Sequence, residues 1–147
     1  MEKKIILMVE DSEDDIKLIL NALKTNRVRN EVEVVRDGEE ALEFIFGTGR
    51  HEGHPHGVDE IAVVLLDIKL PKIDGLEVLK RIREEENTKN VPVVILTSSK
   101  EEKDIENGYK LGCNSYVHKP VSFEEFNSAV KELGLYWLLL NEPPVGS

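Results

Sequence analysis

Short apolar runs alternate with longer amphipathic segments along the chain. Several of the runs are continuously apolar, which is typical of strands buried on both faces of a parallel sheet. The pattern predicts five strands, at residues 5–9, 32–35, 61–66, 93–96 and 115–118.

The segments between the runs carry apolar residues at helical spacing. Ile16, Ile19, Leu20 and Leu23 lie at i, i+3, i+4 and i+7, which places them on one face of a helix. Four more helices are predicted around residues 41–45, 76–82, 105–111 and 123–133. The one around 105–111 has the fewest apolar residues, with Ile105 and Tyr109 on its expected buried face.

Serines followed by acidic residues mark two of the helix starts, and we expect Ser12 and Ser122 to be N-caps. Five strands alternating with five helices predict an α/β doubly wound parallel sheet with right-handed crossovers. We expect one domain over residues 1–140 and a loose tail at 141–147, which contains two prolines. The Gly- and His-rich residues 47–59 are predicted to form a surface loop.

Composition excludes several classes of protein. With 40% hydrophobic residues the chain can bury a continuous core, and no apolar run is long enough to span a bilayer. There are 19 basic and 29 acidic residues, so the net charge of −10 argues against nucleic acid or a membrane as the main partner. The single Cys113 is expected to be a small packed residue and fits a reducing cytoplasm.

Polar side chains follow the predicted strands at their carboxyl ends, where open α/β sheets bind ligands. Glu10 and Asp11 follow the first strand, Asp67 the third, Thr97 the fourth and Lys119 the fifth. Because the carboxyl ends of parallel strands meet at one edge, we expect these side chains to lie together. Each signal taken singly is weak, and the prediction rests on their shared edge.

Three carboxylates at one edge repel one another, by about 4 kcal/mol per pair at about 4 Å and an effective dielectric of about 20. Hard oxygen ligands without His or Cys suit Mg²⁺, or Mn²⁺ in its place, with a position left for a phosphoryl oxygen. Asp67, on the central strand, is the best-placed nucleophile for an acyl phosphate. Lys119 and the Thr97 hydroxyl could then contact the other phosphoryl oxygens.

Other uses of these acids stay open. A metal-dependent hydrolase would need a second acid or a His to activate water, and Lys69 stands two residues after Asp67, where an aspartyl phosphatase usually has an acid. A passive module that holds Mg²⁺ structurally is a third possibility.

Two further metal sites are disfavoured. Asp11, Glu13 and Asp15 alternate like the start of a calcium loop, but Ile16 occupies the position that needs Gly. The loop histidines could bind a metal, but we expect them to be solvated, because no Cys or acid completes a tetrahedral spacing. They are His51, His54 and His56.

These residues resemble the receiver domain of two-component response regulators over essentially the whole chain. The matching stretches are Val9-Glu10-Asp11-Ser12, Leu66-Asp67-Ile68-Lys69-Leu70-Pro71 with Asp74-Gly75, Leu96-Thr97-Ser98-Ser99 and Tyr116-Val117-His118-Lys119-Pro120. The resemblance implies a flavodoxin-like fold. It also implies that Asp67 accepts a phosphoryl group from a sensor histidine kinase, in a protein whose only catalysis is its own phosphorylation and dephosphorylation.

The resemblance assigns roles to the site. Mg²⁺ would be held by Glu10, Asp11, Asp67 and the backbone carbonyl of Lys69. Glu10 stands where many members have Asp, so a difference in the fine geometry of the site is expected.

On phosphorylation, Thr97 would move toward the phosphate and Tyr116, the switch aromatic, would turn inward. This change would alter a protein-interaction surface around the fourth helix and fifth strand. Thr97 and Lys119 would bind phosphoryl oxygens, and the Lys119–Pro120 peptide is expected to be cis.

A narrower resemblance is to the single-domain regulators that partner phytochrome-type and similar histidine kinases. It rests on the long loop before the third strand, on Leu66 to Lys72, on Thr97-Ser98-Ser99 with Asp104-Ile105, and on the segment from Tyr136-Trp137 to Pro143-Pro144. Signalling would then act through surface contact with a downstream protein. The apolar residues 136–140 either pack the last helix onto the sheet or form a partner or homodimer surface.

Overall fold

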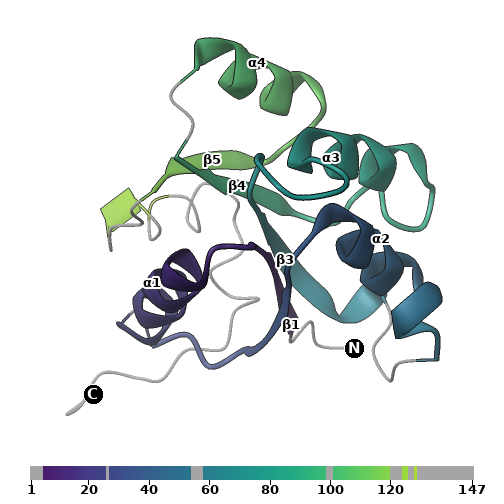
Figure 1. The fold of residues 1–147 in the computed structure, drawn as a ribbon, viewed down its shortest axis with the longest axis horizontal. Helices are drawn as coiled ribbons and strands as arrows, with labels where there is room; N and C mark the ends of the chain where they lie inside the picture. Colours follow the sequence, from purple (N-terminus) through teal and green to yellow (C-terminus); the bar gives the residue numbers. More distant parts are fainter. Residues whose placement is uncertain are drawn as a thin grey trace.

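The computed structural model describes residues 5–25, 27–53, 58–98, 101–119, 124, 125 and 128. Within these residues, five parallel strands form one sheet in the order β2-β1-β3-β4-β5. Figure 1 labels β1, β3, β4 and β5 of this sheet. The strands are β1 (Ile5–Val9), β2 (Glu31–Val35), β3 (Ile61–Leu66), β4 (Val93–Thr97) and β5 (Ser115–His118). The predicted sheet is confirmed, with β2 and β4 each extended by one residue. The strand order places β3 at the centre.

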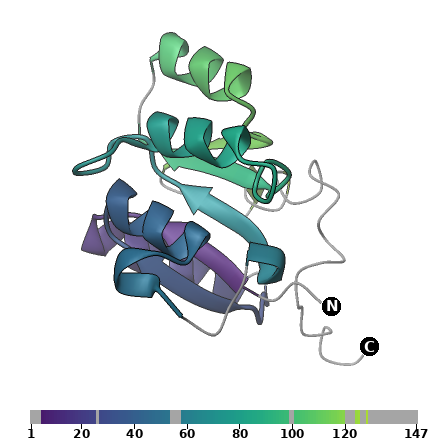
Figure 2. The ribbon, with the colours of Figure 1, turned by 90° about the vertical axis from the view of Figure 1, so that its right-hand side faces the viewer.

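Helices cover both faces of the sheet. Their bounds are α1 (Glu13–Thr25), α2 (Gly38–Phe46), α3 (Gly75–Glu84) and α4 (Glu102–Lys110), with short 3₁₀ helices η1 (Gly49–His51) and η2 (Val58–Glu60). Side chains of α1 pack into one hydrophobic cluster, and those of α2 and α3 pack into another. In Figure 2 the sheet is seen from the side on which α2, α3 and α4 lie. This arrangement is the predicted doubly wound α/β fold.

The central strands explain the continuous apolar pattern. Every residue of β1, β3 and β4 is buried, because helices cover both faces of these strands. Strand β2 lies at an edge and is only partly buried, which is why its sequence alternates Glu with Val. Cys113 is also buried, as predicted, and burial raises the pKa of its thiol to about 11.

Polar caps fix where several helices begin. The predicted cap at Ser12 is confirmed, since its hydroxyl accepts a hydrogen bond from the backbone N–H of Asp15 at 3.3 Å. Asp37 and Asp74 cap α2 and α3 in the same way. Ser122 and most of the predicted last helix lie outside the described residues, although Glu124, Glu125 and Ser128 are helical.

The apolar face predicted for α4 is wrong. Tyr109 is 51% exposed and Ile105 only half-buried, whereas Asp104 and Gly108 are buried. A Cβ on Gly108 would lie 2.9 Å from a side-chain carbon of Ile95. The helix therefore approaches the sheet closely through a residue without a side chain, and it needs no apolar stripe there.

Some sequence-based expectations fall on undescribed residues. The boundary at residue 140, the tail 141–147, the segment 136–140 and Pro120 with its predicted cis peptide all lie outside the described part. Among the residues that are described, no helix has the length and apolar character needed to cross a membrane.

Candidate functional site

Backbone hydrogen bonds continue the sheet one residue beyond its strands and thereby set the positions of the candidate site residues. The N–H of Asp67 donates to the carbonyl of Val9 at 3.1 Å, just past β3. The backbone N–H of Glu10 donates to the backbone carbonyl of Val35 at 3.0 Å, and the backbone N–H of Lys119 donates to the backbone carbonyl of Thr97 at 3.0 Å. The residues predicted to share one edge are therefore brought together there.

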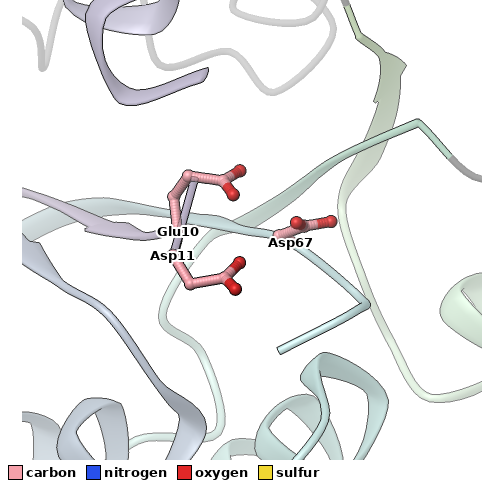
Figure 3. Close-up of side chains that lie close together, drawn as sticks. All are labelled: Glu10, Asp11 and Asp67. Atoms are coloured by element: carbon pink, nitrogen blue, oxygen red, sulfur yellow. The ribbon is translucent and has the colours of Figure 1, made fainter. Parts of the chain in front are cut away.

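Three carboxylates form an acidic cluster at this edge. Glu10, Asp11 and Asp67 each offer one oxygen such that the three oxygens lie within 4.8 Å of one another. Figure 3 shows Glu10 and Asp11 at the end of β1 beside Asp67 at the end of β3. Glu10 and Asp67 are buried, and Asp11 is exposed. An all-carboxylate donor set with one open side fits a hard divalent cation.

Lys119 lies against this acidic cluster. Its Nζ is 2.5 Å from Oε2 of Glu10, 3.2 Å from Oδ2 of Asp67 and 2.8 Å from Oδ2 of Asp15. Burial alone would lower the pKa of Lys119, but its hydrogen bonds to Asp15 and Glu10 and the negative charges around it raise that pKa above the ordinary value. The side chain is therefore an ammonium at neutral pH.

The charges of the site are not balanced by Lys119 alone. Burial is the main influence on the pKa of Glu10 and raises it, and the negative charge of Asp67 acts in the same direction. The hydrogen bond from Lys119 lowers the pKa of Glu10 but does not outweigh these effects. A further positive charge at the acidic cluster would relieve this repulsion, which again favours a cation.

Sequence reasoning missed Asp15 as a member of the site. Its spacing from Asp11 suggests only a disfavoured calcium loop, yet its carboxylate reaches Lys119 from the first turn of α1. The available signal is its position in the turn directly after Glu10 and Asp11. That turn begins at the same edge of the sheet, so a carboxylate there can reach into the site.

The loop between β3 and α3 is held tightly around Asp67. The N–H of Ile68 donates to Oδ1 of Asp67 at 2.8 Å, and the N–H of Gly75 donates to the carbonyl of Ile68 at 2.8 Å. The side chain of Lys69 points to α4, where its Nζ lies 3.8 Å from Oδ2 of Asp104. The Lys69 carbonyl stays a predicted metal ligand.

Thr97 and Tyr116 lie on neighbouring strands. Thr97 ends β4 and is fully buried, whereas Tyr116 in β5 is half-buried with its ring edge-on to His118 at 5.3 Å. Thr97 thus lies at the carboxyl edge of the sheet, whereas Tyr116 lies within its strand. Their movement on phosphorylation stays a prediction.

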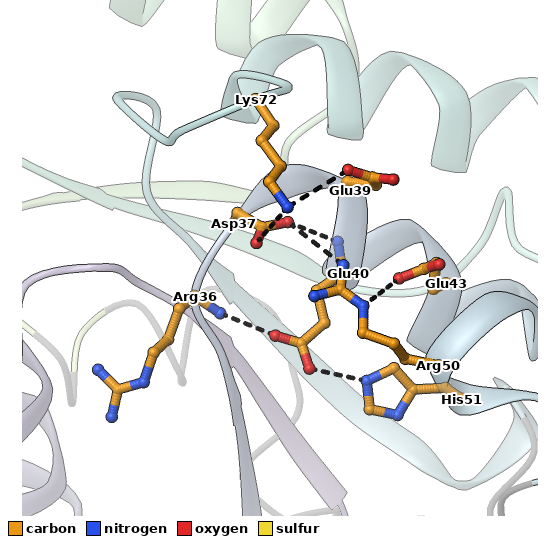
Figure 4. Close-up of polar contacts among 8 residues, drawn as sticks. All are labelled: Arg36, Asp37, Glu39, Glu40, Glu43, Arg50, His51 and Lys72. Carbon is orange, nitrogen blue, oxygen red and sulfur yellow. Dashed lines mark hydrogen bonds and ion pairs between the residues drawn. The ribbon is translucent and has the colours of Figure 1, made fainter.

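His51 differs from the expectation of a solvated side chain. Its side chain is only 20% exposed, its Nε2 lies 2.9 Å from Oε2 of Glu40, and its ring packs edge-on to Phe44. Figure 4 shows it in a polar network with Arg50, which bonds to Glu43. Left-handed backbone at Gly47 and Gly49 turns the chain back onto α2.

His54 and His56 lie outside the described residues. In the same network Lys72 pairs with Asp37 at 3.7 Å and with Glu39 at 3.5 Å, which ties the β3–α3 loop to α2. This polar network therefore supports the loop beside the acidic cluster.

Comparison with known proteins identifies the family. Residues 6–131 match the response regulator receiver domain. This chain belongs to the response regulator receiver family. The receiver fold and the resemblance predicted from the sequence are thus confirmed, and the protein is a two-component response regulator, a signalling protein.

Curated relatives cover nearly the whole receiver. The probable methanogenesis regulatory protein FilR2 of Methanothrix harundinacea is 39% identical over 140 residues, covering 95% of this chain and 87% of that protein. Response regulator Rcp1 of Synechocystis is 37% identical over 135 residues, covering 92% of this chain and 89% of that protein.

Solved structures agree with the receiver fold and include phytochrome-associated regulators. The bacteriophytochrome response regulator RtBRR is 48% identical with a TM-score of 0.85, covering 100% of this chain and 87% of that chain. The Mn²⁺-bound form of Rcp1 is 36% identical with a TM-score of 0.75, covering 97% of this chain and 99% of that chain. The phosphorylated cyanobacterial phytochrome response regulator RcpA is 38% identical with a TM-score of 0.75, covering 92% of this chain and 94% of that chain.

Proposed function

We propose that Asp67 is the phosphoacceptor of this response regulator and that it receives its phosphoryl group from a phosphohistidine of a sensor histidine kinase. The observation that carries the proposal is the position of the Asp67 carboxylate. It shares the acidic cluster with Glu10 and Asp11, and its Oδ2 lies 3.2 Å from the Lys119 ammonium. A buried nucleophilic carboxylate between a cation site and an ammonium suits phosphoryl transfer, which depends on positioning and charge neutralisation.

The transfer step exchanges one bond to phosphorus for another. A carboxylate oxygen of Asp67 attacks phosphorus while the P–N bond of the phosphohistidine breaks. The electron pair of that bond stays on the imidazole nitrogen, which takes up a proton. Lys119 donates to one phosphoryl oxygen and the Thr97 hydroxyl donates to another, so both neutralise charge that develops in the transition state.

The cation is proposed to be Mg²⁺, held by Glu10, Asp11, Asp67 and the backbone carbonyl of Lys69. The all-oxygen donor set supports this choice, and the relative Rcp1 has been solved with Mn²⁺, which accepts similar ligands. A bound cation would supply positive charge for one phosphoryl oxygen and for the crowded carboxylates.

Phosphorylation is proposed to switch a protein-interaction surface. The phosphoryl group adds about −1.5 to −2 charges at neutral pH. That charge attracts Thr97 toward the phosphate, and Tyr116 turns into the space that Thr97 leaves. The surface that changes lies over α4 and β5, where a downstream protein target would bind.

The relatives support a phytochrome-type sensor kinase as the partner, because several are phytochrome response regulators. We also propose that residues 1–140 form the receiver with 141–147 as its tail, that the protein acts in the cytoplasm, and that residues 136–140 can contribute to a homodimer. The protein would turn over no external substrate and would catalyse only its own phosphorylation and dephosphorylation.

Incubation with a small acyl phosphate tests the phosphoacceptor role. Intact-mass spectrometry should find one phosphoryl group per chain when Mg²⁺ is present and none after chelation. Asp67→Asn should abolish labelling, whereas Asp59→Asn, which changes an exposed acid in η2, should label like the wild type. A label that persists in Asp67→Asn would overturn the assignment. Incubation with phosphorylated phytochrome-type kinases then tests the partner.

A further inference from the structure

The Lys119 ammonium has three N–H donors, and three carboxylates surround it. Its hydrogen bonds run to Glu10 at 2.5 Å, to Asp15 at 2.8 Å and to Asp67 at 3.2 Å. Glu10 and Asp67 belong to the acidic cluster that fits a cation, but Asp15 does not. Two of the three partners of Lys119 are therefore shared with the metal site, and the third is separate from it.

This difference matters as soon as a cation binds. A divalent ion would be coordinated by oxygens of Glu10 and Asp67, which would weaken the hydrogen bonds of these carboxylates to the ammonium. We propose that Asp15 is a positioning residue for Lys119, keeping its ammonium at the site while a divalent cation takes the oxygens of Glu10 and Asp67. The inference rests on the proposed function, because it assigns Lys119 to the phosphoryl oxygens.

The backbone around Asp15 supports such a role. The N–H of Asp15 is capped by the Ser12 hydroxyl, and the N–H of Ser12 donates to Oε1 of Glu10 at 3.1 Å. These bonds connect the start of α1 to the acidic cluster. Asp15 is thus fixed by the helix start rather than by the cation.

Exposure separates Asp15 from the other two carboxylates. Its side chain is 29% exposed, against 2% for Glu10 and 8% for Asp67. A carboxylate that keeps part of its hydration loses less solvation free energy than a buried one. Because Asp15 also lies outside the acidic cluster, its contact with Lys119 does not depend on the oxygens that a cation would take.

Loss of the Asp15 charge should weaken cation binding in two ways. The acidic site loses one negative charge near the cation. In addition, Lys119 would bond more fully to Glu10 and Asp67 and compete for the oxygens that the cation needs. The second effect requires contact with Lys119, so it separates a positioning role from a simple contribution of charge.

The matched control is Asp14→Asn, because Asp14 is an exposed acid in the same turn of α1. Calorimetric titration of the full chain with MgCl₂ should show a Kd increased about tenfold in Asp15→Asn and about twofold or less in Asp14→Asn. Asp15→Glu should restore most of the affinity. In a Lys119→Met background, Asp15→Asn should raise the Kd much less than it does in the wild-type background, because only the loss of charge then remains.

A metal-free measurement tests the contact directly. The ¹⁵N resonance of the Lys119 ammonium should have the same chemical shift with EDTA in the wild type and in Asp14→Asn, and a different one in Asp15→Asn, because one of its three hydrogen-bond acceptors is then lost. At saturating Mg²⁺, the maximal rate of labelling by acetyl phosphate should fall severalfold in Asp15→Asn, with the phosphodonor KM little changed.

Two outcomes would overturn the positioning role. One is an equal change in Mg²⁺ affinity for Asp14→Asn and Asp15→Asn, which would show a bulk charge effect. The other is an unaltered Lys119 ammonium resonance in folded Asp15→Asn. The calorimetric and resonance measurements need no phosphorylation, so they test the positioning role independently of the proposed function. The proposed function is contradicted by a different result, namely no phosphoryl label in the wild type or a label that persists in Asp67→Asn.

Discussion

Lys119 Nζ lies 3.2 Å from Asp67 Oδ2, although the two residues are 52 positions apart in the chain. The contact crosses the sheet from the end of β5 to the end of β3, with β4 between them. Both side chains are more than nine-tenths buried. The ammonium is thus a structural counter-charge for the acidic cluster as well as a candidate ligand for phosphoryl oxygens.

Replacing Lys119 by Met should therefore destabilise the metal-free protein. The change leaves Glu10 and Asp67 buried without their cationic partner, and the free energy of unfolding should fall by about 3 kcal/mol. Mg²⁺ should restore stability more strongly in this variant than in the wild type, because the cation then supplies the missing positive charge. Urea unfolding with EDTA and with MgCl₂ measures both effects.

Lys80→Met is the control for that experiment, since Lys80 is an exposed lysine on α3. Its free energy of unfolding should change by less than about 0.5 kcal/mol under either condition. Equal losses in the two variants, or an equal response to Mg²⁺, would contradict the proposed electrostatic role of Lys119.

Much of the sheet and of the site could be predicted from the sequence, for a physical reason. A strand covered by helices on both faces must be apolar throughout, so β1, β3 and β4 appear as uninterrupted runs. Because the strands are parallel, the residues that directly follow them meet at the carboxyl edge of the sheet. Glu10, Asp67 and Lys119 could be grouped by this rule alone, before any distance was known.

The remaining features depend on packing that a one-dimensional pattern does not encode. The helical period cannot show that Asp15 reaches Lys119 rather than solvent. It also fails at α4, where Gly108 permits close approach and Tyr109 stays exposed. His51 packs on Phe44 only because the chain turns back at Gly47 and Gly49.

Arg83 should be important for the stability of the fold. Its half-buried guanidinium donates to the carbonyls of Lys89, Val91 and Gly112 and to the side-chain oxygen of Asn114. Burial lowers the pKa of this arginine, which reports its partial removal from water. Arg83→Met should reduce the free energy of unfolding by about 2 kcal/mol, because four acceptors, one of them the carbonyl of buried Val91, lose a charged donor.

Arg81 on the same helix provides the comparison. It is exposed and pairs only with Glu77 among the contacts seen for it, in an i,i+4 ion pair at 3.1 Å. Arg81→Met should therefore cost less than about 0.5 kcal/mol. Thermal and urea unfolding of the two variants measure both effects. Equal losses in the free energy of unfolding would contradict the proposed role of Arg83.

The buried thiol of Cys113 should make stability depend on alkaline pH. Burial raises its pKa from 9.0 to about 11, so between these values the folded chain keeps a proton that the unfolded chain releases. The free energy of unfolding should therefore fall as pH rises from 9 to 11. Cys113→Ala lacks this contribution and should lose less stability over that interval.

Alkylation provides a second measurement on Cys113. Because the thiolate is the reactive form, iodoacetamide should modify the native chain slowly and the urea-unfolded chain rapidly at mildly alkaline pH. Rapid native alkylation, or parallel pH profiles for the wild type and Cys113→Ala, would contradict a buried, protonated thiol.

Gly75 should be required for the geometry of the metal site. A Cβ at this position would lie 2.0 Å from the carbonyl oxygen of Asp67, so the backbone that carries the phosphoacceptor would have to move. Gly75→Ala should lower the free energy of unfolding by about 2–3 kcal/mol and weaken Mg²⁺ binding, since the β3–α3 loop shifts away from its contact with Ile68. Urea unfolding and calorimetric titration give the two quantities.

Gly53→Ala separates this effect from the ordinary cost of replacing a glycine. Gly53 has a φ of 73°, and a Cβ added there would meet no atom within 4 Å, so the variant should lose about 1 kcal/mol through backbone strain alone. Its Mg²⁺ affinity should equal that of the wild type. The alanine methyl of Gly75→Ala cannot fit without displacing the carbonyl of Asp67. Normal Mg²⁺ binding by Gly75→Ala would therefore contradict the idea that the backbone at the end of β3 positions Asp67 for the cation.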